Sequence, residues 1–205
     1  MLSYYYKTTL ENKVESLYRS HQIYSPHQID IDVIADIFGI VVVSLPDAKE
    51  EAIWDEKRAA VFLNSNKPLA NSKEAFFHEL CHILLHTGNQ LLMNRNFLEF
   101  QEEQANHFLL YAALPFYMIQ QLQLPSLEMD IIHVLASEFG VTHQLARKRW
   151  DQIQRRVYSG KQQFDLEMEL KNQYRKTDPA NWSNETISLY ELAIHRKQMK
   201  ELLAK

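Results

Sequence analysis

Glycine is scarce in this chain, and the positions of its few copies restrict the fold more than any other feature. The 205 residues contain four glycines, and each one follows a stretch in which apolar side chains recur at helical spacing. Glycine just past a helix end adopts the left-handed conformation without steric cost, which makes it a common helix terminator. The sequence therefore predicts a series of helices that end at Gly39, Gly88, Gly140 and Gly160.

Two short segments interrupt this helical pattern. Residues 40–45 (IVVVSL) are rich in β-branched side chains, and residues 59–64 (AAVFLN) lead into a run of turn-forming residues. Each segment is too short for a stable helix, and its composition is typical of a strand. We expect a third, shorter strand at Ile53-Trp54. The predicted fold class is α+β, dominated by helices, with a small β-sheet.

The composition argues against several classes of protein. A net charge of -4 gives no general affinity for nucleic acid or anionic lipid. Cys81 is the only cysteine, so no internal disulfide can form, which is typical of a reducing compartment. No apolar run approaches the length of a membrane span, and the first residues lack the apolar core of a secretory signal. We therefore expect a cytoplasmic protein that does not span a membrane.

Residues 78–82 read His-Glu-Leu-Cys-His, which matches the pattern H-E-x-x-H. Residues four apart on a helix lie one above the other, so His78 and His82 can direct their imidazoles at one metal ion. Glu79 then lies within reach of a water that the metal activates for attack on a carbonyl. We therefore predict a zinc (Zn2+) site with His78 and His82 as ligands and Glu79 as the general base. The alternative is a pair of helix histidines at the edge of the core.

A catalytic zinc ion needs a third protein ligand and keeps its fourth position for water. The helical segment FLEFQEEQANHFLLYAALP carries two candidates, Glu102 and Glu103. Glu102 shares a helix face with Asn106, which could hydrogen-bond a ligand, whereas Glu103 lies about 100° further round the helix. We favour Glu102 on this ground. His86 and His107 are weaker candidates, and we expect His86 to face the C-terminal end of its helix instead of the metal.

Three segments together resemble the ImmA/IrrE-type metallopeptidases. They read AFFHELCHILLH, EEQANHFLLYAALP and FGVTHQLARKRW, and they follow one another in the order found in that family. The pattern IDVIADIFGIVVV and the strand segment AAVFLN also occupy their family positions. The resemblance covers most of the chain, residues 25–155, and does not extend to the residues after 158.

This resemblance implies a zincin-like core with a gluzincin-like site. In such a site His78, His82 and Glu102 bind zinc, and Glu79 acts as the base. The resemblance also implies a protein substrate, namely a helix–turn–helix transcriptional repressor whose cleavage relieves repression. The resemblance therefore points to Glu102, which the helical phase also favours as the third ligand.

The chain departs from the family pattern at three places, none of which removes a ligand. Cys81 stands where glycine is most common, Gln104 stands where many relatives have a second glutamate, and Leu110-Tyr111 replaces a small-acidic pair. By helical phase Cys81 points away from the two histidines of the motif. We therefore expect a thiol buried against the core rather than a redox switch at the zinc.

Residues 128–157 resemble a helix–turn–helix pair, with a turn at Gly140 and a second helix capped at Val141-Thr142. The second helix carries a run of basic residues that could contact phosphates: Arg147, Lys148, Arg149, Arg155 and Arg156. We favour a packed helical pair with a solvated basic face, so DNA contact is the weaker interpretation.

We expect two parts: a metallopeptidase core at residues 1–157, which includes the helix–turn–helix-like pair at residues 128–157, and a helical C-terminal extension at residues 158–205. The predicted activity is that of a zinc endopeptidase acting on a protein substrate, with no membrane partner. Two alternatives remain. One is a non-catalytic or zinc-structural regulator that binds DNA or a protein partner, and the other is a zinc hydrolase with non-peptide substrates. The sequence predicts no particular oligomeric state.

Overall fold

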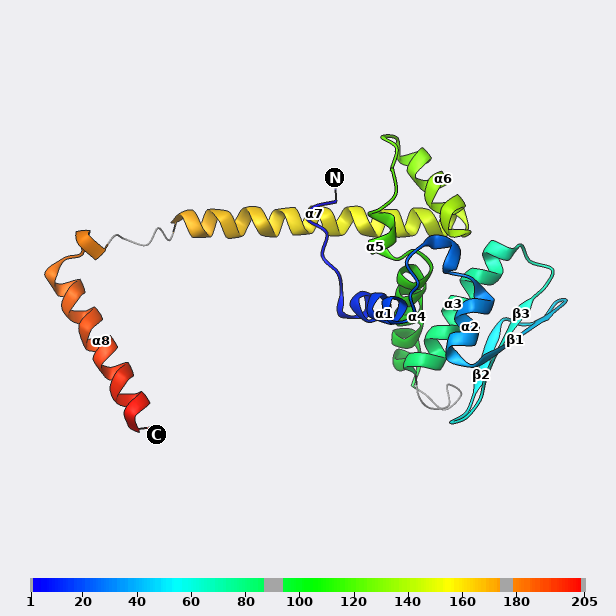
Figure 1. Ribbon diagram of the computed structural model, residues 1–205, viewed down its shortest axis with the longest axis horizontal. Coiled ribbons are helices and arrows are strands. Elements are labelled where there is room, and N and C mark those ends of the chain that lie inside the picture. Colours follow the sequence, from blue (N-terminus) through cyan, green and yellow to red (C-terminus); the bar gives the residue numbers. More distant parts are fainter. Residues whose placement is uncertain (1, 87–93, 174–178, 204–205) are drawn as a thin grey trace. The chain divides into compact units, whose positions relative to one another are not determined.

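The computed structural model describes residues 2–86, 94–173 and 179–203, which form a helix-rich chain with one small sheet (Figure 1). The chain divides into two compact units, residues 1–160 and 161–205. The first unit contains α1 (Thr9–Ser20), η1 (Pro26–Gln28), α2 (Ile31–Phe38), α3 (Leu69–Leu85), α4 (Arg95–Ala113), α5 (Phe116–Ile119) and α6 (Glu128–Phe139). Helix α7 (His143–Gln173) starts in this unit and ends in the second, which also contains η3 (Pro179–Asn181) and α8 (Asn184–Leu203).

The sheet has three strands in the order β1-β3-β2. Their bounds are β1 (Ile40–Leu45), β2 (Glu51–Trp54) and β3 (Ala59–Asn64). The central strand β3 is parallel to β1 and antiparallel to β2, with Ala52 of β2 opposite Val61 of β3. Val61 and Leu63 are buried on one face of β3, as the alternation of side chains along a strand requires. The three predicted strands and the α+β class, with its C-terminal helices, are confirmed.

Local signals in the sequence set the ends of α2 and α6. Asp30 caps α2, because its carboxylate accepts the N–H of Asp32 at 2.9 Å. Helix α2 ends at Gly39 with φ 63°, and α6 ends at Gly140 with φ 61°. Both glycines are left-handed, so these two predicted helix ends are confirmed. The helix end predicted at Gly88 lies outside the described residues.

The prediction that a helix ends at Gly160 is wrong, because α7 continues through this residue to Gln173. A Cβ atom at position 160 would lie 2.0 Å from the backbone oxygen of Tyr4. The absence of a side chain therefore lets the N-terminal segment approach the helix closely. A tertiary contact, and not a helix end, explains this glycine.

Helix α3 packs against β2 and β3, and its first turns also hold the connection between α6 and α7. Lys73 Nζ donates a hydrogen bond to the carbonyl oxygen of Phe139, the last residue of α6, at 2.6 Å. The next residue, Glu74, accepts the N–H of Thr142, which precedes α7, at 2.8 Å. A cation at a helix C-terminus and a carboxylate at a helix N-terminus both complement the helix dipoles. The turn is thus fixed to α3 at both sides.

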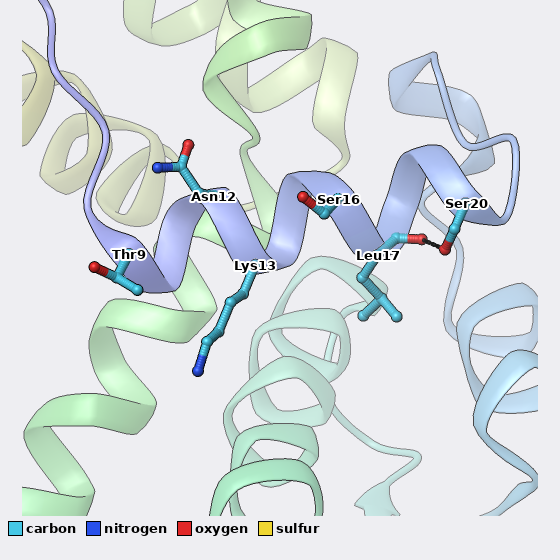
Figure 2. Close-up of a pocket in the computed structure, with 6 residues that line it drawn as sticks. All are labelled: Thr9, Asn12, Lys13, Ser16, Leu17 and Ser20. Atoms are coloured by element: carbon cyan, nitrogen blue, oxygen red, sulfur yellow. Dashed lines mark hydrogen bonds between the residues drawn. The ribbon is translucent and has the colours of Figure 1, made fainter. Parts of the chain in front are cut away.

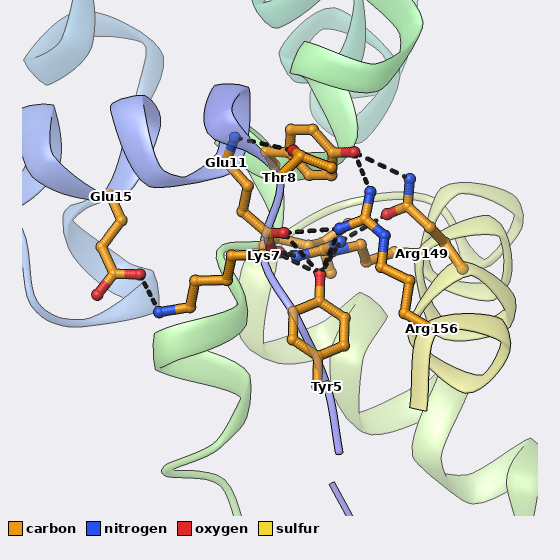
Figure 3. Close-up of polar contacts among 10 residues, drawn as sticks. Tyr5, Lys7, Thr8, Glu11, Glu15, Arg149 and Arg156 are labelled. Atoms are coloured by element: carbon orange, nitrogen blue, oxygen red, sulfur yellow. Dashed lines mark hydrogen bonds and ion pairs between the residues drawn. The ribbon is translucent and has the colours of Figure 1, made fainter. Parts of the chain in front are cut away.

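A buried carboxylate, Glu11 on α1, is the centre of a polar cluster inside the first unit (Figure 3). It forms ion pairs with Arg149 and with Arg156, the latter at 2.7 Å between Oε2 and Nη1. The hydroxyl of Tyr5 donates to the same carboxylate at 2.7 Å. Arg149 also donates from Nε to the carbonyl oxygen of Leu114 at 3.0 Å. Both guanidinium groups are therefore engaged within the unit.

These contacts correct part of the expectation of a solvated basic face on α7. Arg149 is completely buried, and Arg156 is largely buried. Arg147 forms an ion pair with α6, while Lys148 and Arg155 are exposed. Two members of the basic run therefore hold the fold together instead of facing solvent.

The regular structure in the described part of the second unit is helical. Its helices expose many apolar side chains between charged ones. Examples are Phe164 and Leu166 on α7 and Leu189 and Tyr190 on α8. Among the described residues, no helix combines the length and the apolar character needed to cross a membrane.

An alanine at position 160 should destabilise the protein. Its methyl group would occupy space taken by the Tyr4 backbone, so we expect Gly160→Ala to lower the free energy of unfolding by about 1–3 kcal/mol, although alanine favours helix. Ser159→Ala, at the exposed neighbouring position, should change it by less than about 0.5 kcal/mol. Urea denaturation followed by circular dichroism measures both variants. Equal stability of Gly160→Ala and wild type would contradict the close approach.

Lys73 should make stability increase with pH in the alkaline range. Burial lowers the pKa of Lys73 from 10.5 to about 8, so between these values the unfolded chain binds more protons than the folded one. The free energy of unfolding therefore rises with pH across this window. We expect the free energy of unfolding of wild type, minus that of Lys73→Met, to increase by roughly 1–3 kcal/mol from the lower to the upper end of the window. A pH-independent difference in denaturation experiments would show that Lys73 titrates as in the unfolded chain.

Candidate metal centre

Helix α3 places two imidazole rings close together. His78 and His82 are four residues apart on this helix, and their ring centroids are 5.1 Å apart. Their Nε2 atoms lie 3.3 Å from each other, so both rings direct the same nitrogen toward one point. This is the arrangement expected from the spacing of residues i and i+4 on a helix.

Helix α4 brings a carboxylate to the same point. Helix α4 packs against α3 and buries Ala105 and Phe108. Glu102 lies one turn before Ala105, and its side chain is 49% exposed. Glu102 Oε2 lies 3.1 Å from His78 Nε2, and Glu102 Oε1 lies 3.5 Å from His82 Nε2. Within the described part of the chain, these three residues form the group of histidine, cysteine and acidic side chains that could hold a metal ion.

The spacing of the three donor groups fits a tetrahedral metal ion. Zinc binds histidine nitrogen and carboxylate oxygen at about 2.0–2.2 Å, which places two tetrahedral ligand atoms about 3.3–3.6 Å apart. In this structure the two Nε2 atoms are 3.3 Å apart, His78 Nε2 lies 3.1 Å from Oε2 of Glu102, and His82 Nε2 lies 3.5 Å from Oε1 of the same carboxylate. Two histidines and one glutamate also form a donor set typical of catalytic zinc sites. The half-exposed carboxylate leaves the centre accessible from solvent.

The environment of His82 favours a neutral ring. Burial lowers the pKa of the His82 imidazole to about 4, although the nearby Glu102 acts in the opposite direction. The ring is therefore uncharged at neutral pH. A neutral imidazole keeps a lone pair on one nitrogen and can bind a metal ion.

Glu79 follows His78 on α3 and contacts the edge strand β2. Its Oε2 accepts the backbone N–H of Ala52 at 2.9 Å. Burial raises the pKa of Glu79 to about 7, while the hydrogen bond from Ala52 lowers it and the charge of Glu102 raises it. A carboxyl group that titrates near neutral pH can both accept and return a proton during one reaction cycle.

Other candidates from the sequence lie outside the three-residue group. Glu103 and Asn106 are exposed on α4. His107 is also exposed, and its ring stacks against Tyr111 one turn later with centroids 6.3 Å apart. The side chain of α4 that contacts a histidine behind the three-residue group is that of Gln104, and not that of Asn106.

Sequence reasoning missed this role of Gln104. His86 is not part of the metal-binding group; it lies behind His82, with 2.8 Å between the two Nδ1 atoms. The Nε2 atom of His86 lies 3.0 Å from Oε1 of Gln104. The one available signal was that Gln104 replaces a glutamate common among relatives, because an acceptor at this position suits a histidine partner.

Cys81 lies on the same helix but takes no part in the centre. It is completely buried, and burial raises the pKa of its thiol to about 12. The thiol is therefore protonated and unreactive at neutral pH. The expectation of a thiol buried against the core is confirmed.

A surface groove on α1 is separate from these residues (Figure 2). Its lining residues all come from this one helix: Thr9, Asn12, Lys13, Ser16, Leu17 and Ser20. They carry a single charged side chain and do not converge on one point, unlike the side chains of a typical ligand site. None of the candidate ligands or the candidate base contributes to it.

Comparison with known proteins identifies the family. Residues 35–151 match the family of IrrE N-terminal-like domains (Peptidase_M78). The chain belongs to this family. The matched region contains both motif histidines, Glu79 and Glu102, and the result agrees with the resemblance found in the sequence. Family membership supports a metallopeptidase-like or regulatory role.

This family member is similar to two proteins of Bacillus subtilis (strain 168). It is 37% identical to "Phage-like element PBSX protein XkdA" over 151 residues. The aligned region covers 74% of this chain and 76% of that protein. It is 28% identical to "Uncharacterized protein YqaB" over 149 residues. This aligned region covers 71% of this chain and 84% of that protein. A solved structure described as "Mycobacterium tuberculosis transcriptional regulator" is similar over 70% of this chain and 56% of its own length, with 17% identity and a TM-score of 0.47.

Two adjacent glutamates on α4 provide a matched test of the metal centre. Glu102→Ala removes a donor of the three-residue group, whereas Glu103→Ala changes an exposed carboxylate beside it. We expect wild type and Glu103→Ala to bind about one zinc ion per chain, and Glu102→Ala to lose it, because a site left with two protein ligands holds zinc weakly. Metal analysis of the purified proteins gives the ratio. Retention of zinc by Glu102→Ala would exclude this carboxylate as a ligand.

Proposed function

We propose that this chain is a zinc-dependent endopeptidase that hydrolyses a peptide bond in a protein substrate. The observation that carries this proposal is the convergence of the two imidazole nitrogens and the Glu102 carboxylate, whose separations of 3.1–3.5 Å are close to those between the ligands of a tetrahedral zinc ion. A carboxyl group with a pKa of about 7, Glu79, lies on the same helix next to a ligand. Membership in a peptidase family supports the same conclusion.

In this proposal the three donors hold zinc, and Glu79 moves the proton. When bound, zinc lowers the pKa of a water molecule and polarises the carbonyl group of the scissile bond. Glu79 accepts the proton of the attacking water and delivers it to the leaving amine nitrogen. The N–H of Ala52 holds one oxygen of this carboxylate, which leaves the other oxygen available for the proton.

We propose that the substrate binds as an extended segment beside β2. This strand lies at the edge of the sheet, and an extended peptide can add to a sheet edge through main-chain hydrogen bonds. Such a peptide would lie close to Glu79, because the carboxylate already contacts Ala52 in the middle of this strand. The scissile segment of the substrate must therefore be a loop or another region that can become extended.

We further propose a helix–turn–helix transcriptional repressor as the substrate and the cytoplasm as the place of cleavage. The resemblance to the ImmA/IrrE-type metallopeptidases supports this substrate class. In this reading the enzyme acts on gene regulation through proteolysis, without contacting DNA itself.

Replacement of Glu79 by glutamine separates a peptidase from a regulator that needs only the fold. Glutamine retains an oxygen for the Ala52 N–H but accepts no proton, so we expect unchanged zinc content and cleavage slowed by about 10²–10⁴-fold. Glu103→Gln is the matched control and should behave as wild type. The zinc-loaded proteins are incubated with helix–turn–helix repressors of the same genome, and new N-termini are identified by mass spectrometry.

Two outcomes would count against the peptidase. Cleavage by Glu79→Gln at the wild-type rate would assign the activity to another group or to a contaminant. A biological output that is identical in cells carrying wild type or Glu79→Gln, without new N-termini in either, would favour a regulator that acts by binding.

A further inference from the structure

His86 is a buried histidine at the end of the zinc-site helix, and both of its ring nitrogens have partners. It directly follows the last residue of α3 and is 5% exposed. Its Nδ1 lies 2.8 Å from Nδ1 of His82, the ring nitrogen on the far side from the metal-facing Nε2. Its Nε2 lies 3.0 Å from the amide oxygen of Gln104 on α4. The chain His82–His86–Gln104 therefore links the two helices behind the metal centre.

The positions of the protons in this series of hydrogen bonds follow from the chemistry of Gln104, its last member. A neutral imidazole has one N–H donor and one acceptor nitrogen. Gln104 presents an oxygen, so a neutral His86 donates from Nε2, and its Nδ1 is then an acceptor. His82 in turn donates from Nδ1, which places the lone pair of its ring on Nε2. That nitrogen is the one that points toward His78 and Glu102.

The opposite assignment is incompatible with metal binding. If Gln104 donated from its amide nitrogen, His86 would accept at Nε2 and donate from Nδ1. His82 would then accept at Nδ1 and carry its proton on Nε2, where a metal ion needs a lone pair. The orientation of one amide group on α4 thus decides whether His82 can be a ligand.

We propose that His86 and Gln104 are positioning residues that hold His82 in the tautomer required for zinc binding. This inference rests on the proposed zinc function. Partners of this kind fix the tautomer and orientation of a ligating histidine, and their loss costs about 10–100-fold in metal affinity. A glutamate at position 104 would perform the same task, because a carboxylate can only accept this hydrogen bond. The departure of Gln104 from the family pattern therefore preserves the acceptor.

Zinc affinity, measured by competition with a chelator at neutral pH, provides the first test. We expect Gln104→Leu and His86→Phe to bind zinc about 10–100-fold more weakly than wild type. Gln104→Glu, which restores an acceptor, should bind as tightly as wild type or more tightly. His107→Phe, at an exposed histidine of α4, is the control and should leave the affinity unchanged. Circular dichroism shows whether each variant keeps its helical content, and Gln104→Leu decides the test if His86→Phe fails to fold.

Nitrogen-15 NMR of the histidine rings in the metal-free protein provides the second test. We expect the proton of His82 on Nδ1 and that of His86 on Nε2 in wild type and in Gln104→Glu. Gln104→Leu should lose this single tautomer. A wild-type His82 protonated on Nε2, or zinc affinities of Gln104→Leu and His86→Phe equal to that of wild type, would overturn the proposal. Absence of zinc binding by wild type would instead overturn the proposed function, and the tautomers would still decide whether His86 and Gln104 position His82.

Discussion

The rest of the first unit depends on helix α3, because this helix must satisfy three sets of partners at once. Its apolar face packs on the sheet, and its first turns hold the α6–α7 connection through Lys73 and Glu74. Its last turns carry His78 and His82. Successive residues on a helix are fixed at about 100° and 1.5 Å from each other, so none of these contacts can shift without the others. The geometry of the candidate metal centre therefore depends on the packing of the whole helix.

The second helix of the centre, α4, is fixed at its C-terminal end by a buried charge. Arg149 donates to the carbonyl oxygen of Leu114, which caps α4, and the same guanidinium pairs with Glu11 on α1. Removing one partner of a buried ion pair is costly, by about 3–5 kcal/mol, because the remaining charge is left unpaired. The cluster therefore holds α1, α4 and α7 in one arrangement. Glu102 lies about three helical turns before Leu114, so the position of Glu102 relative to α3 depends on the contact between Arg149 and Leu114.

Local signals carried the predictions that succeeded, and distant contacts explain those that failed. Strands rich in β-branched residues and left-handed glycines are determined within a few residues, and the spacing of His78 and His82 needs only a helix. Gly160 looked like another helix end, but its small size serves a contact with the N-terminal segment. Helical phase and the family pattern selected Glu102, and the structure places its carboxylate beside both histidines. The contact of Gln104 with His86 could not be predicted in this way, because it depends on how two helices cross.

The environment of Glu79 explains how one carboxylate can suit both halves of the proposed reaction. Burial and the neighbouring charge of Glu102 raise its pKa, and the N–H of Ala52 lowers it, with the balance near 7. A cation at the three donors would lower it further, because positive charge favours the ionised carboxylate. Glu79 would then be ready to accept a proton when the centre is loaded. A substrate strand that covers β2 would exclude water and raise the pKa again, which favours return of the proton to the leaving nitrogen.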